Sequence, residues 1–544
     1  MRLTPSGDAL YYGDNLDVLR NHIEDESVDL IYLDPPFNSN ANYNVLFKSP
    51  DGKQSQSQIE AFEDTWHWTD TAEEAFDDVM RSGHSDAAEM LRAMRSMLKE
   101  NDMMAYLAMM AVRLIELHRV LKPTGSLYLH CDPTASHYLK LLLDAVFGVS
   151  SFKNEVTWKR TTTHSDSKTW SRVSDVILFF AKGKSFTWNT PRENHSTEYV
   201  ASKYRYQDSD GRLYRLDNMT SPSSRPNMMY DWKGFPFPPY GWRYSKETMA
   251  KLDNEGRVHY PRKKDGTFDY SKRLSLKRYL AEMQGGVMGS IWTDIPPINS
   301  QAAERLGYPT QKPVALLERI LKASSNEGDV VLDPFCGCGT TIHAAEKLNR
   351  QWIGIDVTHL AIGLIRDRLR NAFPQADFDV YGVPRDLLAA RELASADKHE
   401  FQLWALSLIN AQPYKGGRKG ADGGVDGYIW FQPDGRNHEK AVVSVKGGEN
   451  VDVKMIRDLI ATVDREKAKV GVFVTLTEPT RPMKTEAAAA GFYDSPNHGR
   501  FAKIQILTIA DLFAQQKPHL PWIAPSSKRA KREQGEDRQL GMEL

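Results

Sequence analysis

Residues 331–341 read VLDPFCGCGTT, an apolar strand that passes through a glycine-rich turn into the start of a helix. Glycines in such a turn let the backbone approach a bound ligand closely, because no Cβ stands in the way. The next apolar segment ends in Gly354-Ile355-Asp356, which places a carboxylate where ribose hydroxyls bind in doubly wound sheets. These segments predict a parallel α/β sheet with a ligand at the carboxyl ends of its strands, although the glycine spacing differs from the GxGxxG dinucleotide fingerprint.

Strand and helix patterns alternate on both sides of this motif. We expect one α/β domain in two halves, residues 1–185 and 306–385, with an inserted module at 186–305 that is rich in aromatic, basic, Pro and Gly residues. A second α/β domain is expected at residues 397–513, and a flexible basic tail at 514–544. The expected strands of the first domain are residues 9–12, 28–33, 126–131, 155–159, 173–180, 330–335 and 352–357. The expected helices are residues 103–121, 137–147, 314–323, 340–348 and 360–371.

The composition is typical of a multidomain globular protein, with 544 residues, 41% hydrophobic and 26% charged. The formal net charge is -1, so a nucleic-acid surface has to come from local clusters of basic residues. Cys131, Cys336 and Cys338 form neither a disulfide framework nor a zinc-ligand pattern, and we interpret the last two as small turn residues. No signal segment or membrane span is visible, which predicts a cytoplasmic protein without a membrane partner.

A second motif follows the apolar run at residues 28–33, which ends in Asp34-Pro35-Pro36-Phe37. An aromatic amine is a poor nucleophile because its lone pair is delocalised into the ring. A carboxylate and a backbone carbonyl that both accept from the NH2 group would free that lone pair, and Asp34 and Pro35 can supply the two acceptors. Phe37 would offer a face on which an extruded base stacks. Taken alone, the motif also fits a plain turn at the end of a strand.

Together the motifs resemble the β class of DNA amino-methyltransferases, and in particular type III modification subunits, over residues 9–375. In that family the catalytic motif precedes the cofactor motif, which implies a circularly permuted Rossmann-like fold with a target-recognition module between the two. The resemblance implies S-adenosylmethionine as the cofactor. It assigns the catalytic role to Asp34, Pro35, Pro36 and Phe37, and cofactor binding to Asp14, Lys312, Pro313, Asp333, Phe335, Gly337, Gly339, Thr340, Thr341 and Asp356.

The base that is modified is expected to be adenine in double-stranded DNA. An Asp at position 34, where other members have Ser, is what adenine-specific members of the family show. Phe37 stands where Tyr is commoner, which leaves N4-methylation of cytosine open as the alternative. A homodimer and a separate restriction or helicase subunit are further alternatives that the sequence leaves open.

The inserted module has the composition of a DNA-reading surface. Residues 241–280 contain eleven Lys and Arg against five Asp and Glu, interleaved with aromatic residues. Basic side chains neutralise phosphates while aromatic ones stack on bases. The expected backbone contacts are Arg262, Lys263, Lys264, Lys272 and Arg273. The alternative is a solvated charged loop over a small aromatic core.

The C-terminal segment resembles the restriction-endonuclease-like domains of the Mrr type. In that group an Asp on one strand and a Glu/Gln-x-Lys on the next hold a divalent metal such as Mg²⁺. Asp426 and Lys446 match the pattern, and Glu400 is the expected additional acid, but Ser444 stands where a metal ligand is expected. We expect a small mixed sheet with a hairpin turn at residues 433–435 and with Asp426 and Lys446 facing one cleft. Nuclease activity within a bifunctional restriction-modification chain and a DNA-clamping domain without cleavage are the two alternatives.

Overall fold

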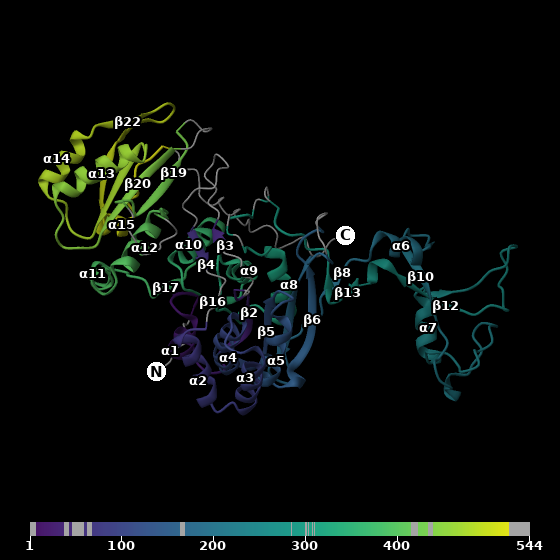
Figure 1. The fold of residues 1–544 in the computed structure, drawn as a ribbon. Helices are drawn as coiled ribbons and strands as arrows, with labels where there is room; N and C mark the ends of the chain where they lie inside the picture. Colours follow the sequence, from purple (N-terminus) through teal and green to yellow (C-terminus); the bar gives the residue numbers. More distant parts are fainter. Residues whose placement is uncertain are drawn as a thin grey trace. The chain divides into compact units, whose positions relative to one another are not determined.

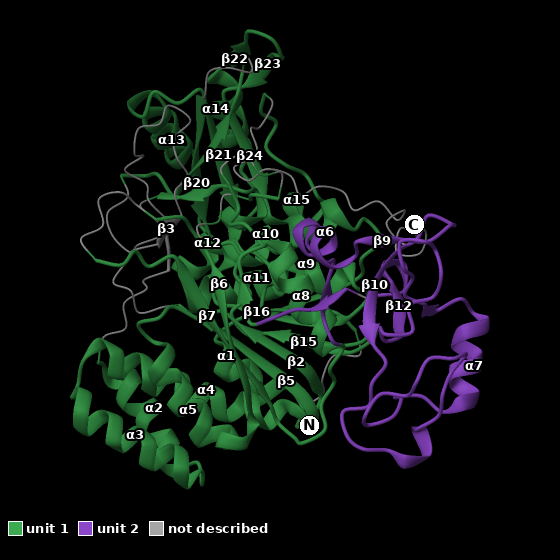
Figure 2. Ribbon diagram, turned by 90° about the vertical axis from the view of Figure 1, so that its right-hand side faces the viewer, with its two compact units in different colours: residues 1–189, 290–544 green, residues 190–289 purple. Residues whose placement is uncertain are grey.

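Figure 1 presents a computed structural model of the protein. It describes residues 7–36, 43–45, 59–62, 68–163, 169–283, 285–299, 302, 304–306, 308, 310–414, 423–433 and 439–521. The chain divides into two compact units (Figure 2), the first formed by Met1–Asn189 with Ser290–Leu544 and the second by Thr190–Gly289. The second unit falls within residues 186–305, where the insertion was expected.

A nine-stranded sheet organises the first unit, in the order β14-β6-β7-β5-β2-β15-β16-β1-β17. All of its strands run parallel except β7, which is antiparallel to both neighbours. The strands are β1 Ala9–Tyr12, β2 Val28–Leu33, β5 Leu121–Cys131, β6 Phe152–Lys159, β7 Ser174–Ala181, β14 Ile291–Trp292, β15 Val330–Asp333, β16 Gln351–Asp356 and β17 Asp379–Tyr381. The Rossmann-like fold with the permuted motif order is confirmed, because β2 and β15 are neighbours although about 300 residues separate them.

Helices cover both faces of this sheet, which explains why its strands are continuous apolar runs. On β2, Ile31 and Leu33 face one helical layer, while Leu30 and Tyr32 face the other. The first layer contains α1 Asn15–His22, α2 Asp70–Arg81, α3 Ser85–Leu98, α4 Asp102–Val120 and α5 Ser136–Phe147. The second contains α8 Val314–Ser324, α9 Thr340–Lys347 and α10 His359–Ala372.

Two parts of this domain differ from the sequence expectation. The helices α2 and α3 were not expected, and neither was α1. Residues 122–125 were expected to separate the helix at 103–121 from the strand at 126–131. They instead belong to β5, which begins directly after α4 at Leu121. A register shift on β2 between Val28 and Leu30 accommodates these residues, because a bulge takes up extra residues without ending a strand.

The second unit has more regular structure than its composition predicted. Four strands form a sheet in the order β11-β12-β10-β9, and Phe235 and Trp242 are buried in a small core beside it. The elements are α6 Thr197–Lys203, α7 Lys246–Asn254, β9 Tyr206–Gln207, β10 Leu213–Asn218, β11 Val258–His259, β12 Ser275–Tyr279 and the pair β8 Arg192–Glu193 with β13 Gly286–Val287. Another two-stranded pair, β3 Tyr43–Val45 with β4 Ile59–Phe62, belongs to the first unit.

The C-terminal domain contains the expected small mixed sheet, in the order β18-β19-β20-β21-β24. The hairpin of β19 with β20 is antiparallel, whereas β21 pairs in parallel with β20 and β24. Residues 434 and 435 of the expected turn lie outside the described residues. The elements are α11 Leu387–Ala396, α12 Lys398–Leu408, β18 Gln412–Pro413, β19 Gly427–Phe431, β20 Glu439–Lys446, α13 Val453–Arg465, β21 Val470–Thr475, α14 Arg481–Ala489, β22 Phe492–Ser495, β23 Gly499–Ala502, β24 Ile504–Thr508 and α15 Ile509–Phe513. Among the described residues, no helix combines the length and apolar character that crossing a membrane requires.

Candidate active site

A cavity of about 580 Å³ lies at the carboxyl ends of the central strands. The walls of this cavity lie on either side of β2, the middle strand of the sheet, and Asp34 directly follows β2. On one side, β15, β16 and β1 contribute residues such as Asp333, Asp356 and Asp14. On the other side, β6 and β7 contribute Trp158 and Asp175. The site is therefore assembled where a doubly wound sheet binds its ligands.

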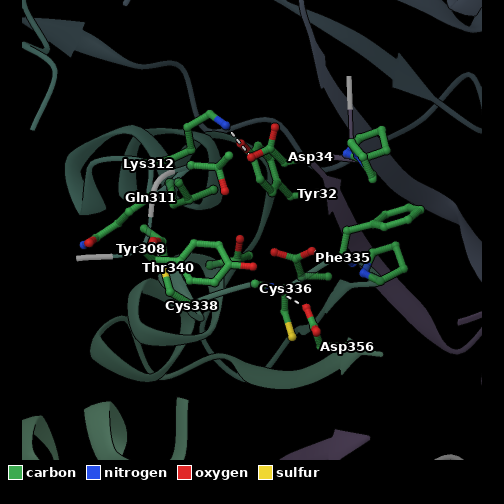
Figure 3. Close-up of a pocket in the computed structure, with 18 of the residues that line it drawn as sticks. Tyr32, Asp34, Tyr308, Gln311, Lys312, Phe335, Cys336, Cys338, Thr340 and Asp356 are labelled. Carbon is green, nitrogen blue, oxygen red and sulfur yellow. Dashed lines mark hydrogen bonds and ion pairs between the residues drawn. The ribbon is translucent and has the colours of Figure 1, made fainter. Parts of the chain in front are cut away.

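Asp34 is held by a residue that comes almost 280 positions later in the chain. The ammonium of Lys312 donates a hydrogen bond to Asp34 Oδ2 (Figure 3), and both side chains are largely buried. Pro35 and Pro36 follow Asp34 in the wall of the cavity. Phe37 lies outside the described residues. The family resemblance implied that Lys312 lies beside the cofactor. In the structure Lys312 contacts Asp34, the candidate catalytic residue.

The glycine-rich turn between β15 and α9 is fixed by two buried carboxylates. Asp333 Oδ1 accepts from the Phe335 amide at 3.0 Å, and Asp356 Oδ2 accepts from the Gly337 amide at 3.0 Å. Gly337 and Gly339 have φ values of +51° and +73°, a region that disfavours residues with a Cβ. A Cβ on Gly339 would stand 2.7 Å from Ile365 Cγ1, so the turn is also closely packed.

Burial dominates the electrostatics of these two acids. It raises the pKa of Asp333 to about 7 and that of Asp356 to about 6, although hydrogen bonds oppose the shift in both cases. Asp356 Oδ1 accepts from the amide and the hydroxyl of Thr358 at 2.9 Å and 2.8 Å. The carboxylate of Asp356 still has lone pairs that accept no hydrogen bond in this network. Hydroxyl groups in the cavity that donate to those lone pairs would stabilise its ionised form.

A buried arginine that the sequence analysis missed positions Asp14. Arg113 is 5% exposed, and it donates to Asp14 Oδ2 at 2.8 Å and to Asn15 Oδ1 at 2.5 Å. Asn15 in turn donates to the carbonyl of Pro334 at 2.8 Å, so the network ties the start of α1 to the glycine-rich turn. Burial lowers the pKa of Arg113, and Asp14 opposes that effect. The available signal was that Arg113 is the one charged residue in the apolar run at residues 103–115.

The opposite wall of the cavity was also missed by the sequence analysis. It includes Tyr32, Trp158, Arg160, Asp175 and Pro297. The indole of Trp158 donates to the carbonyl of Ile295 at 3.0 Å, which holds the 295–298 loop at the cavity. A polar Asp175 at the start of an apolar strand was a usable signal, because a buried charge in a strand requires a partner.

In the C-terminal domain, Asp426 and Lys446 come together as predicted. Asp426 is 4% exposed, its Oδ2 accepts from the Val445 amide at 2.6 Å, and Lys446 Nζ lies 3.7 Å from the same oxygen. Ser444 is buried on β20, two residues before Lys446. Within the described ranges no group of three or more His, Cys, Asp or Glu side chains could hold a metal ion. One carboxylate beside an ammonium does not fit Mg²⁺, which requires several oxygen ligands.

Glu400 contacts a different set of residues from the one predicted. Its Oε2 accepts from the Tyr12 hydroxyl at 2.5 Å and lies 3.5 Å from His359 Nε2. The hydrogen bond with His359 lowers the pKa of Glu400 to about 2, although partial burial opposes it. The Glu400 carboxylate therefore contacts residues at the end of β1 and at the start of α10.

Two family models match the chain. The first, described as a DNA methylase, matches residues 28–365, which is more than half of the chain. The chain belongs to the DNA methylase family. The second model, described as a restriction endonuclease, matches residues 393–503, so this DNA methylase carries a C-terminal domain of that family. Both resemblances stated from the sequence are confirmed.

The relatives of this DNA methylase include type II methyltransferases and Mod subunits of type III restriction-modification enzymes. The type II methyltransferase M.EcaI of Enterobacter cloacae is 32% identical over 302 residues, which cover 55% of this chain and 65% of that protein. The Mod subunit of the type III enzyme StyLTI from Salmonella typhimurium is 28% identical over 358 residues, covering 62% and 50%. The chain thus spans between half and two thirds of these relatives. A putative DNA modification methylase of Thermus thermophilus, solved with S-adenosyl-L-methionine, is 17% identical with a TM-score of 0.33 and covers 69% of this chain and 99% of that one.

The basic residues predicted to contact DNA lie in the second unit of this DNA methylase. Arg262, Lys263, Lys264, Lys272 and Arg273 are all exposed. Arg262 donates to the carbonyl of Gly266 at 2.7 Å, and its guanidinium lies over the ring of Phe268. The aromatic residues around them form the small core of the unit, so the charged loop and the aromatic core of the alternative interpretation are both present.

Proposed function

We propose that this chain is an S-adenosylmethionine-dependent DNA methyltransferase that modifies the exocyclic amino group of a base. One observation carries the proposal: Asp34 follows the strand that separates the two walls of a single cavity. A methyl donor against β15, β16 and β1 and a base against β6 and β7 would then meet at Asp34. The family membership of residues 28–365 supports the same activity.

The cofactor side of the cavity fits S-adenosylmethionine. The cavity volume of about 580 Å³ is in the range of cofactor sites, and Gly337 lines the cavity with backbone alone. Asp356 would accept hydroxyl groups of the ribose, and Asp14 would face the adenine ring. Pro313, Phe335, Thr340 and Thr341 line the same wall. When bound, the cofactor supplies a methyl group on a positively charged sulfur, which is a strong electrophile.

On the base side, the chain supplies acceptors for an amino group. Asp34 and the carbonyl of Pro35 would accept the two hydrogens of the NH2 group, which draws its nitrogen toward tetrahedral geometry and frees the lone pair. Lys312 orients the carboxylate through Oδ2. The flat, apolar surfaces of Trp158 and Pro297 would enclose an extruded base, and Phe37 would stack on it.

We infer that the substrate is double-stranded DNA and that the product is N6-methyladenine. The basis for adenine is Asp at position 34, a family pattern, and the Mod-subunit relatives are in keeping with it. Unmethylated phage DNA is incubated with labelled S-adenosylmethionine, digested to nucleosides and analysed by mass spectrometry. N6-methyladenine is expected, N4-methylcytosine would overturn the choice of base, and no incorporation would overturn the function.

For the C-terminal domain we propose contact with DNA or with a partner, without efficient cleavage. The observation that favours this over a working nuclease is the ligand set: Asp426 lies beside the ammonium of Lys446, and among the described residues no group of three or more His, Cys, Asp or Glu side chains could hold a metal ion. The Mod-subunit relatives suggest a complex with a separate restriction subunit, and a homodimer or a complex with a helicase subunit is the alternative. Sedimentation with and without DNA measures the assembly.

A further inference from the structure

Three buried polar side chains on adjacent strands form a chain of hydrogen bonds beside the cavity. The Tyr32 hydroxyl on β2 lies 2.8 Å from His130 Nδ1 on β5, and His130 Nε2 lies 3.2 Å from Asp175 Oδ2 on β7. Their exposed fractions are 2%, 0% and 1%. Tyr32 and Asp175 line the cavity, and Tyr32 stands next to Asp34 (Figure 3). None of the three is used by the methyl-transfer chemistry described so far.

The direction of these hydrogen bonds follows from Asp175. Burial raises the pKa of Asp175, but the hydrogen bond from His130 and nearby positive charges such as that of Lys312 together hold that pKa below its ordinary value. Arg160 Nε, 3.1 Å from Asp175 Oδ1, adds a further positive charge. An ionised carboxylate only accepts, so His130 Nε2 carries a proton and donates it. In neutral imidazole Nδ1 is then an acceptor, and Tyr32 donates to it.

Consequently the Tyr32 oxygen has its own proton committed to His130 and presents lone pairs to the cavity. The proposed reaction creates a need for such a group. When the amino nitrogen forms its new bond to carbon, it becomes positively charged and has to lose one proton. The cofactor leaves as a neutral thioether and accepts no proton. Asp34 is already engaged by Lys312 through Oδ2.

We propose that Tyr32, His130 and Asp175 form a proton relay that removes the proton released from the base during methyl transfer. This inference rests on the proposed function. The N–H bond breaks and its electron pair stays on nitrogen, while the proton passes to the Tyr32 oxygen. Tyr32 simultaneously gives its own proton to His130 Nδ1, and the resulting imidazolium is stabilised by the carboxylate of Asp175. The relay resets through Tyr32 when the methylated base leaves and water reaches the cavity.

The relay predicts a particular pH dependence. His130 has to be neutral before each turnover, so the single-turnover rate falls when acid protonates it. The charged groups around the relay are Asp34 and Asp333 near Tyr32, and Lys312 and Arg160 near Asp175. The edge of the Trp158 indole, at 5.8 Å and 89° from the His130 ring, packs against it and keeps water away.

The first test compares two buried tyrosines on the same face of the sheet. Tyr32→Phe removes the relay hydroxyl, whereas Tyr128→Phe removes a hydroxyl that contacts Ser324 at 2.6 Å outside the cavity lining. Both variants lose one buried hydrogen bond. We expect Tyr32→Phe to lower the single-turnover rate of methylation by on the order of tenfold or more, and Tyr128→Phe to stay within about twofold of wild type. The calorimetric affinity for S-adenosylmethionine should be unchanged in both.

The second test uses the acid limb of the pH–rate profile. His130→Gln keeps a polar side chain between Tyr32 and Asp175 but cannot be protonated, so the fall in rate at low pH should be lost or displaced. Imidazole added to His130→Gly should restore part of the rate in proportion to neutral imidazole. Equal rates for Tyr32→Phe and wild type, or an unchanged profile in folded His130→Gln, would overturn the relay. A wild-type protein that methylates no DNA would instead overturn the proposed function.

Discussion

Replacing Asp356 should change both the strength and the pH dependence of cofactor binding. In the ligand-free protein the buried carboxyl has a pKa raised to about 6 by desolvation. Hydroxyl groups that donate to its ionised form stabilise that form, so the pKa has to fall when the ribose binds. Cofactor affinity therefore rises with pH up to about the free pKa and is constant above it.

The size of the effect follows from the hydrogen bonds. Bonds to a charged acceptor contribute roughly 1.5–3 kcal/mol, which corresponds to about a ten- to 150-fold loss of affinity in Asp356→Ala at pH 8. A carboxyl with a pKa of about 6 is about nine-tenths protonated at pH 5, so wild type should itself lose up to about tenfold between pH 7 and 5. Asp356→Asn keeps an acceptor for the Gly337 amide but has no proton to lose, so the change in affinity around pH 6 should disappear, and only that of Asp333, whose pKa is raised to about 7, can remain.

Calorimetric titration with S-adenosylmethionine measures both quantities. Titrations from pH 5 to 8, in buffers that differ in ionisation enthalpy, report the protons released on binding. Near pH 6, wild type should release about half a proton more than Asp356→Asn. Asp34→Asn is the matched control, because its carboxylate lies beyond the cofactor side and proton release should persist. Wild-type pH dependence retained in Asp356→Asn would refute the assignment of the ribose to this carboxylate.

Three further changes test other parts of the site. Asp34→Ala should abolish methyl incorporation while calorimetry finds the cofactor affinity within about tenfold of wild type, and near-normal incorporation would contradict its role at the amine. Gly339→Ala should lower the thermal midpoint of unfolding and weaken cofactor binding. Its Cβ would stand 2.7 Å from Ile365 in a backbone with φ of +73°, which costs about 1–2 kcal/mol or more. An unchanged midpoint and affinity would argue against a tight turn. Plasmid incubated with Mg²⁺ or Mn²⁺ should stay intact for wild type and Lys446→Ala alike, whereas cutting by wild type that the variant loses would identify a working nuclease.

The sequence by itself determined the framework of this protein. Apolar runs such as residues 28–33 are buried on both faces, so they predict central strands whatever surrounds them. The motifs at Asp34 and at Gly337 and Gly339 could be located for the same reason, since a tight turn after a buried strand restricts which residues can stand there. Asp426 and Lys446 were placed together because a hairpin fixes the distance between neighbouring strands.

Only the tertiary structure decided which side chains meet across the sheet. Lys312 reaches Asp34 because the sheet order inserts β15 beside β2, and no local pattern specifies that pairing. Arg113 and the chain from Tyr32 through His130 to Asp175 look like isolated polar residues in apolar segments. Their hydrogen-bond and ion-pair partners lie on other helices and strands. These interactions offset the cost of burying a polar group only once those elements have packed together. Local sequence restricts the backbone over a few residues, whereas contacts between distant residues depend on the topology of the whole sheet.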